Sequence, residues 1–218
     1  MAAMSPATWY KVEQLPWPAD WPALFGRAAP LVMEIGFGSG LFLADWARRR
    51  PEANLLGVEI SIPALRRAGR KLEQSGLNNV RLMQADAAAV LRALCLPADL
   101  AAVVINFPDP WPKKDHDARR LIDDPFLCLL ASRMAAGGAL DIATDHDEYA
   151  AQIEGCLARS PHFESRAVAP FVLSDPGRLT TKYEQVALSE GRTPRYFPWR
   201  RNATPVDNAF ATPQEVGM

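Results

Sequence analysis

A glycine-rich loop is the first part of the chain whose residue types and spacing could do chemistry. Glu34-Ile-Gly36-Phe-Gly38-Ser-Gly40 ends an apolar run and leads into a segment of helical composition. A strand-to-helix loop of this kind presents backbone amides and the positive end of a helix dipole to a ligand. A dinucleotide fingerprint, G-x-G-x-x-G, requires Gly or Ala at position 41, where this chain has Leu41. The spacing therefore excludes a dehydrogenase loop and predicts another small-molecule site.

Three carboxylates accompany this loop and indicate its ligand. Glu34 lies two residues before the first glycine, and Glu59 and Asp86 end the next two apolar runs. The pattern E-x-G-x-G-x-G resembles the S-adenosylmethionine (SAM) loop of Rossmann-like methyltransferases, and acids suit SAM because it carries a sulfonium and an ammonium group. We expect Glu34 to face the methionine end, Glu59 the ribose hydroxyls and Asp86 the adenine amino group. Asp86 is also placed to cap the helix that follows it.

A second segment, Asn106-Phe-Pro-Asp109-Pro-Trp-Pro-Lys-Lys114, holds an acid in a stiff loop. Three prolines and a tryptophan restrict the backbone on both sides of Asp109. Because the segment follows another apolar run, we expect Asp109 at the same edge as the glycine loop, beside the methyl donor. A plain turn would need only one or two of these residues, so the loop is interpreted as holding a positioning residue.

Regularly alternating elements must position these residues. Short apolar runs of strand length alternate with Ala-, Leu- and Arg-rich segments of helical length. The predicted strands are 31–37, 54–60, 80–86, 100–107 and 139–145, and the predicted helices are 40–50, 63–75, 86–95, 123–136 and 147–160. Strands that are apolar on both faces belong in a parallel sheet covered by helices on both sides. We therefore predict a doubly wound, Rossmann-like α/β fold.

The end of the chain breaks this alternation. Residues 163–169 and 182–188 predict two further strands, which would close the sheet with an antiparallel hairpin. The expected organisation is a proline- and tryptophan-rich N-terminal arm (1–30), a methyltransferase domain (31–201) and a loose C-terminal tail (202–218). With 218 residues, 49% of them hydrophobic and 22% charged, the chain has an ordinary globular composition.

Composition also limits location and cofactors. No apolar run approaches the roughly 18 to 20 residues of a membrane span, and residues 1–11 lack the features of an export signal. Three cysteines without a CxxC pair indicate buried thiols in a reducing compartment, and the scattered histidines give no support to a metal site. We therefore expect a soluble cytoplasmic protein without a metal, acting as a monomer or a homodimer.

Charge is unevenly distributed along the chain. The formal net charge is −1, but residues 177–201 contain six Lys and Arg against two Glu. This basic C-terminal edge could contact phosphates, or it could be an ordinary solvated surface. The sequence leaves both possibilities open.

Taken together, the motifs strongly resemble the bacterial tRNA (guanine-N7-)-methyltransferase family. The matching blocks occur in the family's order and span about residues 31 to 190: 34–40, Gly57-Val-Glu59, Gln84-Ala-Asp86, 107–114, Ala143-Thr-Asp145 and Thr181-Lys182-Tyr183-Glu184. The resemblance implies SAM contacts at Glu34, Glu59, Asp86 and Asp109, and makes Asp109 the catalytic residue. It implies substrate contacts at Lys113, Asp145 and Thr181 through Glu184, and a guanine in the variable loop of tRNA as the methyl acceptor.

The implied reaction agrees with these residue types. N7 of guanine carries a lone pair and no proton, so its attack on the SAM methyl group needs alignment but no general base. An Arg or Lys fork on O6 and N7 would block the reacting atom. Asp145 and Glu184 could instead accept from N1 and N2 of an unstacked guanine, while Lys113 and the basic edge hold phosphates.

Some residues depart from the family pattern on the expected RNA face. Asp115 and Asp117 interrupt a run that is basic in relatives, and Val186-Ala187 replaces an Arg-Gly pair. We therefore expect weak tRNA binding with a shallow salt dependence, carried by Lys113, Arg119, Arg120 and Arg178. Two alternatives stay open: a diverged paralogue that methylates another RNA or a small molecule, and a non-catalytic protein that only binds SAM or RNA.

Overall fold

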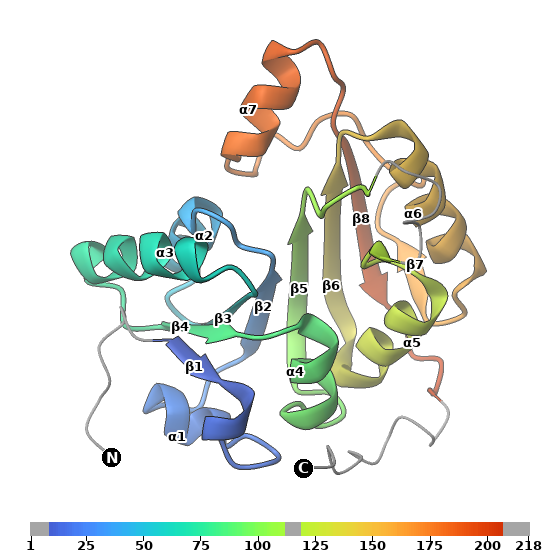
Figure 1. Cartoon of the computed structure of the whole chain (residues 1–218). Coiled ribbons are helices and arrows are strands. Elements are labelled where there is room, and N and C mark those ends of the chain that lie inside the picture. Colours follow the sequence, from blue (N-terminus) through green and yellow to red (C-terminus); the bar gives the residue numbers. More distant parts are fainter. Residues whose placement is uncertain (1–8, 112–118, 207–218) are drawn as a thin grey trace.

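The computed structural model describes residues 9–111 and 119–206 (Figure 1). Its strands are β1 (Trp9–Lys11), β2 (Leu31–Ile35), β3 (Asn54–Glu59), β4 (Val80–Gln84), β5 (Leu100–Asn106), β6 (Met134–Thr144), β7 (Phe163–Ser165) and β8 (Arg195–Arg201). Its helices are α1 (Trp21–Phe25), α2 (Leu41–Arg49), α3 (Ile62–Ser75), α4 (Ala87–Ala93), α5 (Asp124–Arg133), α6 (Asp147–Arg159) and α7 (Lys182–Ser189), with a 3-10 turn at Val12–Gln14. None of the helices in these ranges is both long and apolar enough to cross a membrane.

The strands form one eight-stranded sheet in the order β1-β4-β3-β2-β5-β6-β8-β7. The pairs from β1 to β6 are parallel, and β8 pairs antiparallel with both β6 and β7. The chain runs outward in one direction from β2 to β4 and in the other from β5 to β6. The strand order therefore reverses between β2 and β5, and ligands of open α/β sheets bind at the carboxyl ends beside such a point.

Helices cover both faces of the sheet. On one face α4, α5 and α6 pack with α1 in the larger hydrophobic cluster, and on the other α2 and α3 form the smaller cluster with the opposite side chains of β2, β3 and β4. The predicted doubly wound α/β class with an antiparallel C-terminal strand is thus confirmed. Helix α7 stands apart from both layers, above the carboxyl ends of the parallel strands (Figure 1).

Two predicted boundaries are wrong. The helix expected to reach residue 136 ends at Arg133, because the chain turns into β6 at Met134 and pairs there with Leu100. The glycines expected to end that helix, Gly137 and Gly138, lie inside β6, where the pairing with β5 shifts register. A side chain at Gly138 would come within 3.0 Å of backbone oxygens, so close strand contact explains the glycine.

The predicted hairpin is also wrong in its second strand. Residues 182–189 form helix α7, and β8 supplies the antiparallel strand thirteen residues later than expected. Thr181 and Glu184 form a reciprocal capping box, in which each side chain accepts from the other's backbone N–H. This T-x-x-E signal starts a helix, and it overrides the strand predicted for residues 182–188.

The predicted N-terminal arm and C-terminal tail both include residues that lie against the sheet. In the arm, β1 extends the sheet beside β4, and Trp21 and Phe25 of α1 are buried in the core. In the tail, residues 202–206 follow β8 and Arg201 donates to Thr204 O. Residues 1–8 and 207–218 lie outside the described ranges.

Candidate active site

The glycine loop lies at the carboxyl end of β2, as predicted. Gly36, Gly38 and Gly40 all have positive φ angles of +73°, +51° and +69°. Gly40 needs to be glycine for two reasons: its φ angle is positive, and a Cβ at this position would lie 2.6 Å from the Cβ of Ala68 in α3. The loop therefore packs directly on α3, and its glycine amides are bonded within the protein: the Gly36 N–H donates to Val58 O and the Gly40 N–H to Phe37 O, both at 2.8 Å.

Glu59 fixes this loop to the end of β3. One carboxylate oxygen accepts from the Gly38 N–H at 3.1 Å, and the other accepts from the Ile60 and Ser61 N–H groups at 2.9 and 3.0 Å. Each oxygen of an ionised carboxylate has two lone-pair sites, so capacity for hydroxyl donors remains. The acid thus organises the loop in addition to any contact with a ligand.

Glu34 is a buried acid with one unsatisfied oxygen. Its side chain is 1% exposed, and Asn106 Nδ2 donates to its Oε1 at 3.1 Å. Among the described residues, no group donates to its Oε2. Burial raises the pKa of Glu34 to about 8, against the opposing effects of Asn106 and Arg178. An unsatisfied buried carboxylate at the reversal point of the sheet is suited to a cationic ligand group.

The other two acids lie at the same edge in different settings. Asp86 caps α4 by accepting from the Ala89 N–H at 3.1 Å, which agrees with the capping alternative and leaves its second oxygen outside that bond. Asp109 is exposed in the loop after β5. The structure thus places Glu34, Glu59, Asp86 and Asp109 around the carboxyl ends of neighbouring parallel strands.

The loop that carries Asp109 is held in place by hydrogen bonds from Arg120. Phe107 and Trp111 have positive φ angles of +50° and +41°, which non-glycine residues rarely adopt. The buried guanidinium of Arg120 donates to the carbonyls of Pro110 at 2.6 Å and Trp111 at 3.5 Å. The stiffness expected from the prolines is thus reinforced by an arginine. Lys113, Asp115 and Asp117 lie outside the described residues.

Helix α7 brings the Thr181–Glu184 segment over the glycine loop. Lys182 and Tyr183 are exposed, whereas Thr181 and Glu184 are buried. The Tyr183 ring lies beside Gly38, since a Cβ built there would be 3.5 Å from Tyr183 Cε2. Both oxygens of Glu184 are bonded within the protein, one to Tyr196 Oη at 2.7 Å and the other to the Thr181 N–H and Arg178.

Arg178 is the site residue that the sequence interpretation misplaced. Its side chain is 9% exposed, pairs with Glu184 and donates to the side-chain oxygen of Asn106. The prediction that Arg178 and Arg120 bind phosphate is wrong, because both side chains are buried and bonded within the protein. The sequence signal that could have indicated a structural role for Arg178 is its position three residues before the capping box of α7.

Asp145 follows the end of β6 and is paired with Arg192. Its side chain is 14% exposed, while Arg192 is 45% exposed and also binds Glu190. The aspartate therefore lies at the carboxyl edge with a partner that is itself partly exposed to solvent.

The predicted basic C-terminal edge is largely neutralised in the fold. Acids from other segments pair with Arg192, Arg195 and Arg200, while Arg178 pairs with Glu184 of the same segment and the buried Arg201 donates to backbone carbonyls. Several of these partners come from α6, β7 and the loop after β6, so the local charge count did not include them. Of the two possibilities that the sequence left open for this edge, these pairings favour an ordinary charged surface over a phosphate-binding one.

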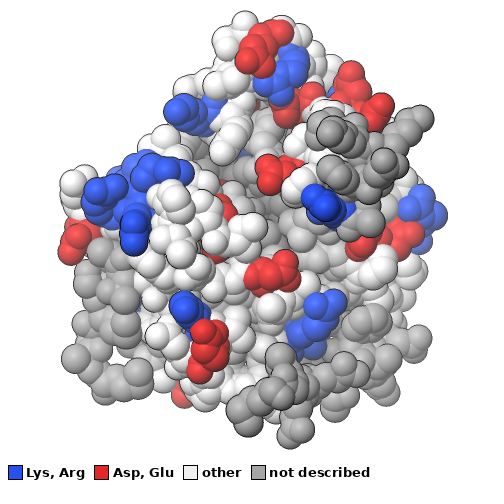
Figure 2. Space-filling view, viewed as in Figure 1, with Lys and Arg blue, Asp and Glu red and all other residues white. Residues whose placement is uncertain are grey.

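A different basic surface appears on α3. Arg66, Arg67 and Arg70 are exposed, and within the described ranges none of them pairs with an acid. Figure 2 shows a blue patch over the outer side of this helix, next to the hollow between α3 and α7. We call these three residues the α3 arginines.

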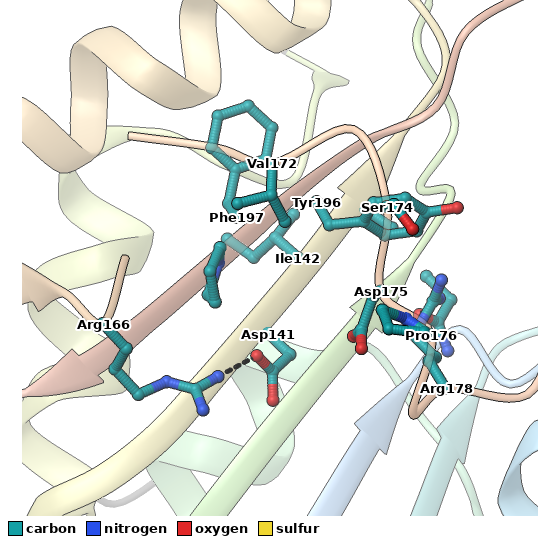
Figure 3. A pocket seen from close by; sticks show the side chains of 13 residues that line it. Asp141, Ile142, Arg166, Val172, Ser174, Asp175, Pro176, Arg178, Tyr196 and Phe197 are labelled. Carbon is teal, nitrogen blue, oxygen red and sulfur yellow. Dashed lines mark hydrogen bonds and ion pairs between the residues drawn. The ribbon is translucent and has the colours of Figure 1, made fainter. Parts of the chain in front are cut away.

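A cavity of about 270 Å³ lies under the segment that leads to α7 (Figure 3). Asp141 and Arg166 form an ion pair at one side of it, and Asp175 and Arg178 lie at the other. Burial raises the pKa of Asp141, opposed by Arg166. Within the described ranges, no group of three His, Cys, Asp or Glu side chains could hold a metal ion.

Comparison with known proteins gives close sequence relatives. A family described as putative methyltransferase matches residues 28–195. The chain is 48% identical over 133 residues to a protein of Thermus thermophilus named tRNA (guanine-N(7)-)-methyltransferase, covering 61% of this chain but only 43% of that protein. It is 44% identical over 172 residues to a protein of the same name from Thiobacillus denitrificans, covering 79% of this chain and 75% of the relative.

Solved structures share the fold at lower identity. The antibiotic-resistance methyltransferase Kmr superposes with a TM-score of 0.58 at 23% identity, covering 88% of this chain and 96% of Kmr. A putative methyltransferase of Streptococcus mutans, solved in complex with SAH, superposes with a TM-score of 0.52 at 15% identity, covering 79% of this chain and 88% of that one. These likenesses support the fold class.

Proposed function

This chain belongs to the tRNA (guanine-N(7)-)-methyltransferase family, and from that membership we propose that it transfers the methyl group of SAM to N7 of a guanine in the variable loop of tRNA. The observation that carries the proposal is the gathering of Glu34, Glu59, Asp109 and Asp145 at one edge of the sheet around the glycine loop. A tRNA substrate and the free buried thiols Cys95 and Cys156 favour a cytoplasmic location.

The residues present fit SAM. The unsatisfied, buried carboxylate of Glu34 suits the cationic methionine end. Glu59 accepts from three backbone N–H groups, which leaves one lone-pair site on Oε2 for a ribose hydroxyl. Asp86 would accept from the adenine amino group with the oxygen that does not cap α4. When bound, SAM supplies an electrophilic methyl group; the glycine loop and the three acids orient it.

The acceptor side of the site has to align guanine N7 with that methyl group. Asp109, held on a loop tied by Arg120, is placed to stabilise the positive charge that moves onto the purine. Asp145 can exchange Arg192 for the N1 and N2 donors of guanine. Glu184 is buried, with both oxygens bonded within the protein, so its contribution is to hold α7, which presents Lys182 and Tyr183 to the substrate.

The proposal is tested by incubating the protein with labelled SAM and bulk tRNA, followed by nuclease digestion and identification of the labelled nucleoside. We expect 7-methylguanosine, and sequencing of the modified tRNAs should locate it in the variable loop. Another methylated nucleoside would support the diverged-paralogue alternative. Binding of SAM without any transfer would support the non-catalytic alternative.

Glu34 provides a prediction about protons. In the absence of SAM, its pKa of about 8 leaves the carboxyl mostly neutral at neutral pH. A cation beside it favours the ionised form and lowers the pKa, so binding of SAM at about pH 7 should release up to roughly one proton. Titration calorimetry in buffers of different ionisation enthalpy measures this release, and Glu34→Gln should abolish it. Equal apparent enthalpies in all buffers for the wild type would contradict the assignment.

The α3 arginines give the proposed tRNA surface. The helix begins three residues after Glu59, and its unpaired cations complement a phosphate backbone. Each phosphate contact contributes roughly 0.7 to 0.9 to the slope of log affinity against log salt. Arg66→Glu, Arg67→Glu and Arg70→Glu should therefore each weaken tRNA binding and reduce that slope by roughly one contact.

The matched control is Arg92→Glu, which reverses an exposed arginine on α4, on the opposite face of the sheet. A salt titration of tRNA affinity for the four variants decides the question. Equal losses in the control and the α3 variants would show a nonspecific charge effect, and no loss in any α3 variant would place the RNA elsewhere.

A further inference from the structure

Arg178 connects the two halves of the site. We propose that Arg178 is a positioning residue that locks α7 onto the end of β5, so that the substrate-facing helix is held in register with the methyl-donor loop. Nothing in the residue's sequence position required this role, and it is separate from the phosphate contact expected of it. The expected effect on the rate of methyl transfer rests on the proposed function. The expected loosening of α7 does not, because it can be measured without any methyl transfer.

The guanidinium is shared between two elements that lie far apart in the chain. Arg178 Nη1 donates to Glu184 Oε2 at 3.2 Å on α7, and its Nη2 donates to Asn106 Oδ1 at the carboxyl end of β5. Asn106 in turn donates through Nδ2 to Glu34. A continuous series of side-chain bonds thus runs from Glu34 beside the glycine loop to Glu184 under the substrate-facing helix.

The surroundings of Arg178 favour a fixed, charged guanidinium. Aromatic rings of Phe42, Phe107 and Tyr196 face its central carbon at 5.2, 5.8 and 5.1 Å. These rings come from α2, the residue after β5, and β8, so two further elements, α2 and β8, meet at the same side chain. A planar guanidinium can stack flat on these rings while its fixed N–H groups donate to two separate acceptors, whereas the ammonium of a lysine has three donors but no planar face for stacking.

Removing this bridge should affect α7 first. Glu184 is 8% exposed, so without Arg178 its charge would be buried with only Tyr196 and the Thr181 backbone as partners. Tyr183 lies on the same helix and reaches Gly38, so a displaced α7 would also lose its contact with the donor loop. Small misplacements of a substrate-positioning element lower the rate of alignment-dependent reactions by up to about a hundredfold.

The chain provides a matched control in Arg166. This arginine lines the other side of the same cavity and is also paired with an acid, Asp141 (Figure 3). Its hydrogen bonds go to Asp141 and Trp199 O, and none goes to Asn106 or Glu184. Arg178→Lys and Arg166→Lys therefore each replace a paired guanidinium of one cavity, 9% exposed in Arg178 and 36% exposed in Arg166. Only the first breaks the bond series between β5 and α7.

The experiment compares both variants with the wild type by three measurements. For Arg178→Lys we expect turnover at saturating tRNA and SAM to fall about tenfold or more, while the dissociation constant of SAM changes by less than about threefold. Amide hydrogen exchange in residues 182–189 should speed up in the same variant without any substrate present. Arg166→Lys should keep wild-type turnover and exchange in α7.

The outcomes separate this inference from the proposed function. Turnover of Arg178→Lys within twofold of wild type, unchanged exchange in α7, or an equal loss in Arg166→Lys would overturn the positioning role. If the wild type transfers no methyl group to tRNA, the proposed function fails, and the hydrogen-exchange comparison alone still decides whether Arg178 holds α7.

Discussion

Asp109→Asn is expected to lower turnover about a hundredfold or more without unfolding the protein, the range for removing one preorganised electrostatic group. Asparagine has nearly the same shape, and Asp109 is exposed, so the loop should keep its conformation. What is lost is the negative charge that favours the cationic product at N7. Single-turnover methylation, with enzyme in excess and SAM saturating, measures the chemical step directly.

Two comparisons make this expectation specific. Asp147→Asn removes an equally exposed acid of α6, near the same edge of the sheet, and should leave the single-turnover rate within a fewfold of wild type. Arg120→Lys loosens the loop from behind, because it breaks the donation to Pro110 O, and should lower the rate while Asp109 is intact. A rate for Asp109→Asn within a fewfold of wild type would reduce Asp109 to a structural turn residue.

The second large effect is expected at Glu59. Glu59→Ala should weaken SAM binding by roughly 1.5 to 3 kcal/mol, or about ten- to hundredfold, the scale for losing charge-assisted hydrogen bonds. The structure adds a reason beyond the ribose hydroxyls, because this carboxylate also accepts from three backbone N–H groups that shape the glycine loop and the start of α3. Calorimetry with SAM measures the loss.

A control for Glu59 lies seven residues earlier. Glu52 is exposed just before β3, so Glu52→Ala changes the net charge equally without touching the loop. We expect its SAM affinity to match that of the wild type. If Glu59→Ala binds SAM as tightly as the wild type, the ribose assignment and the loop-anchoring role are both wrong.

The sequence by itself determined the fold class and the position of the glycine loop, because both follow from the types and spacing of residues that are close together in the chain. Apolar runs of strand length between helical segments fixed the doubly wound class, because burial on both faces of a strand leaves a continuous apolar pattern. The spacing of Gly36, Gly38 and Gly40 predicted a sharply turning loop after a strand, and all three glycines have the positive φ angles that such a loop requires. The places of Glu59 and Asp109 at the carboxyl ends of strands were predicted in the same way, from the ends of strand-length runs.

Tertiary structure decided the features that depend on distant partners. The burial of Arg178 follows from Asn106, 72 residues earlier in the chain, and the neutralisation of Arg192 follows from Asp145, 47 residues earlier. Helix α7 was mistaken for a strand because eight residues carry too few repeats to separate the two periods, and its capping box was counted only as a substrate motif. Neither the charge of a short segment nor its hydrophobic periodicity can reveal these pairings between distant residues. The paired residues meet only after folding of the sheet has brought the carboxyl ends of its strands together.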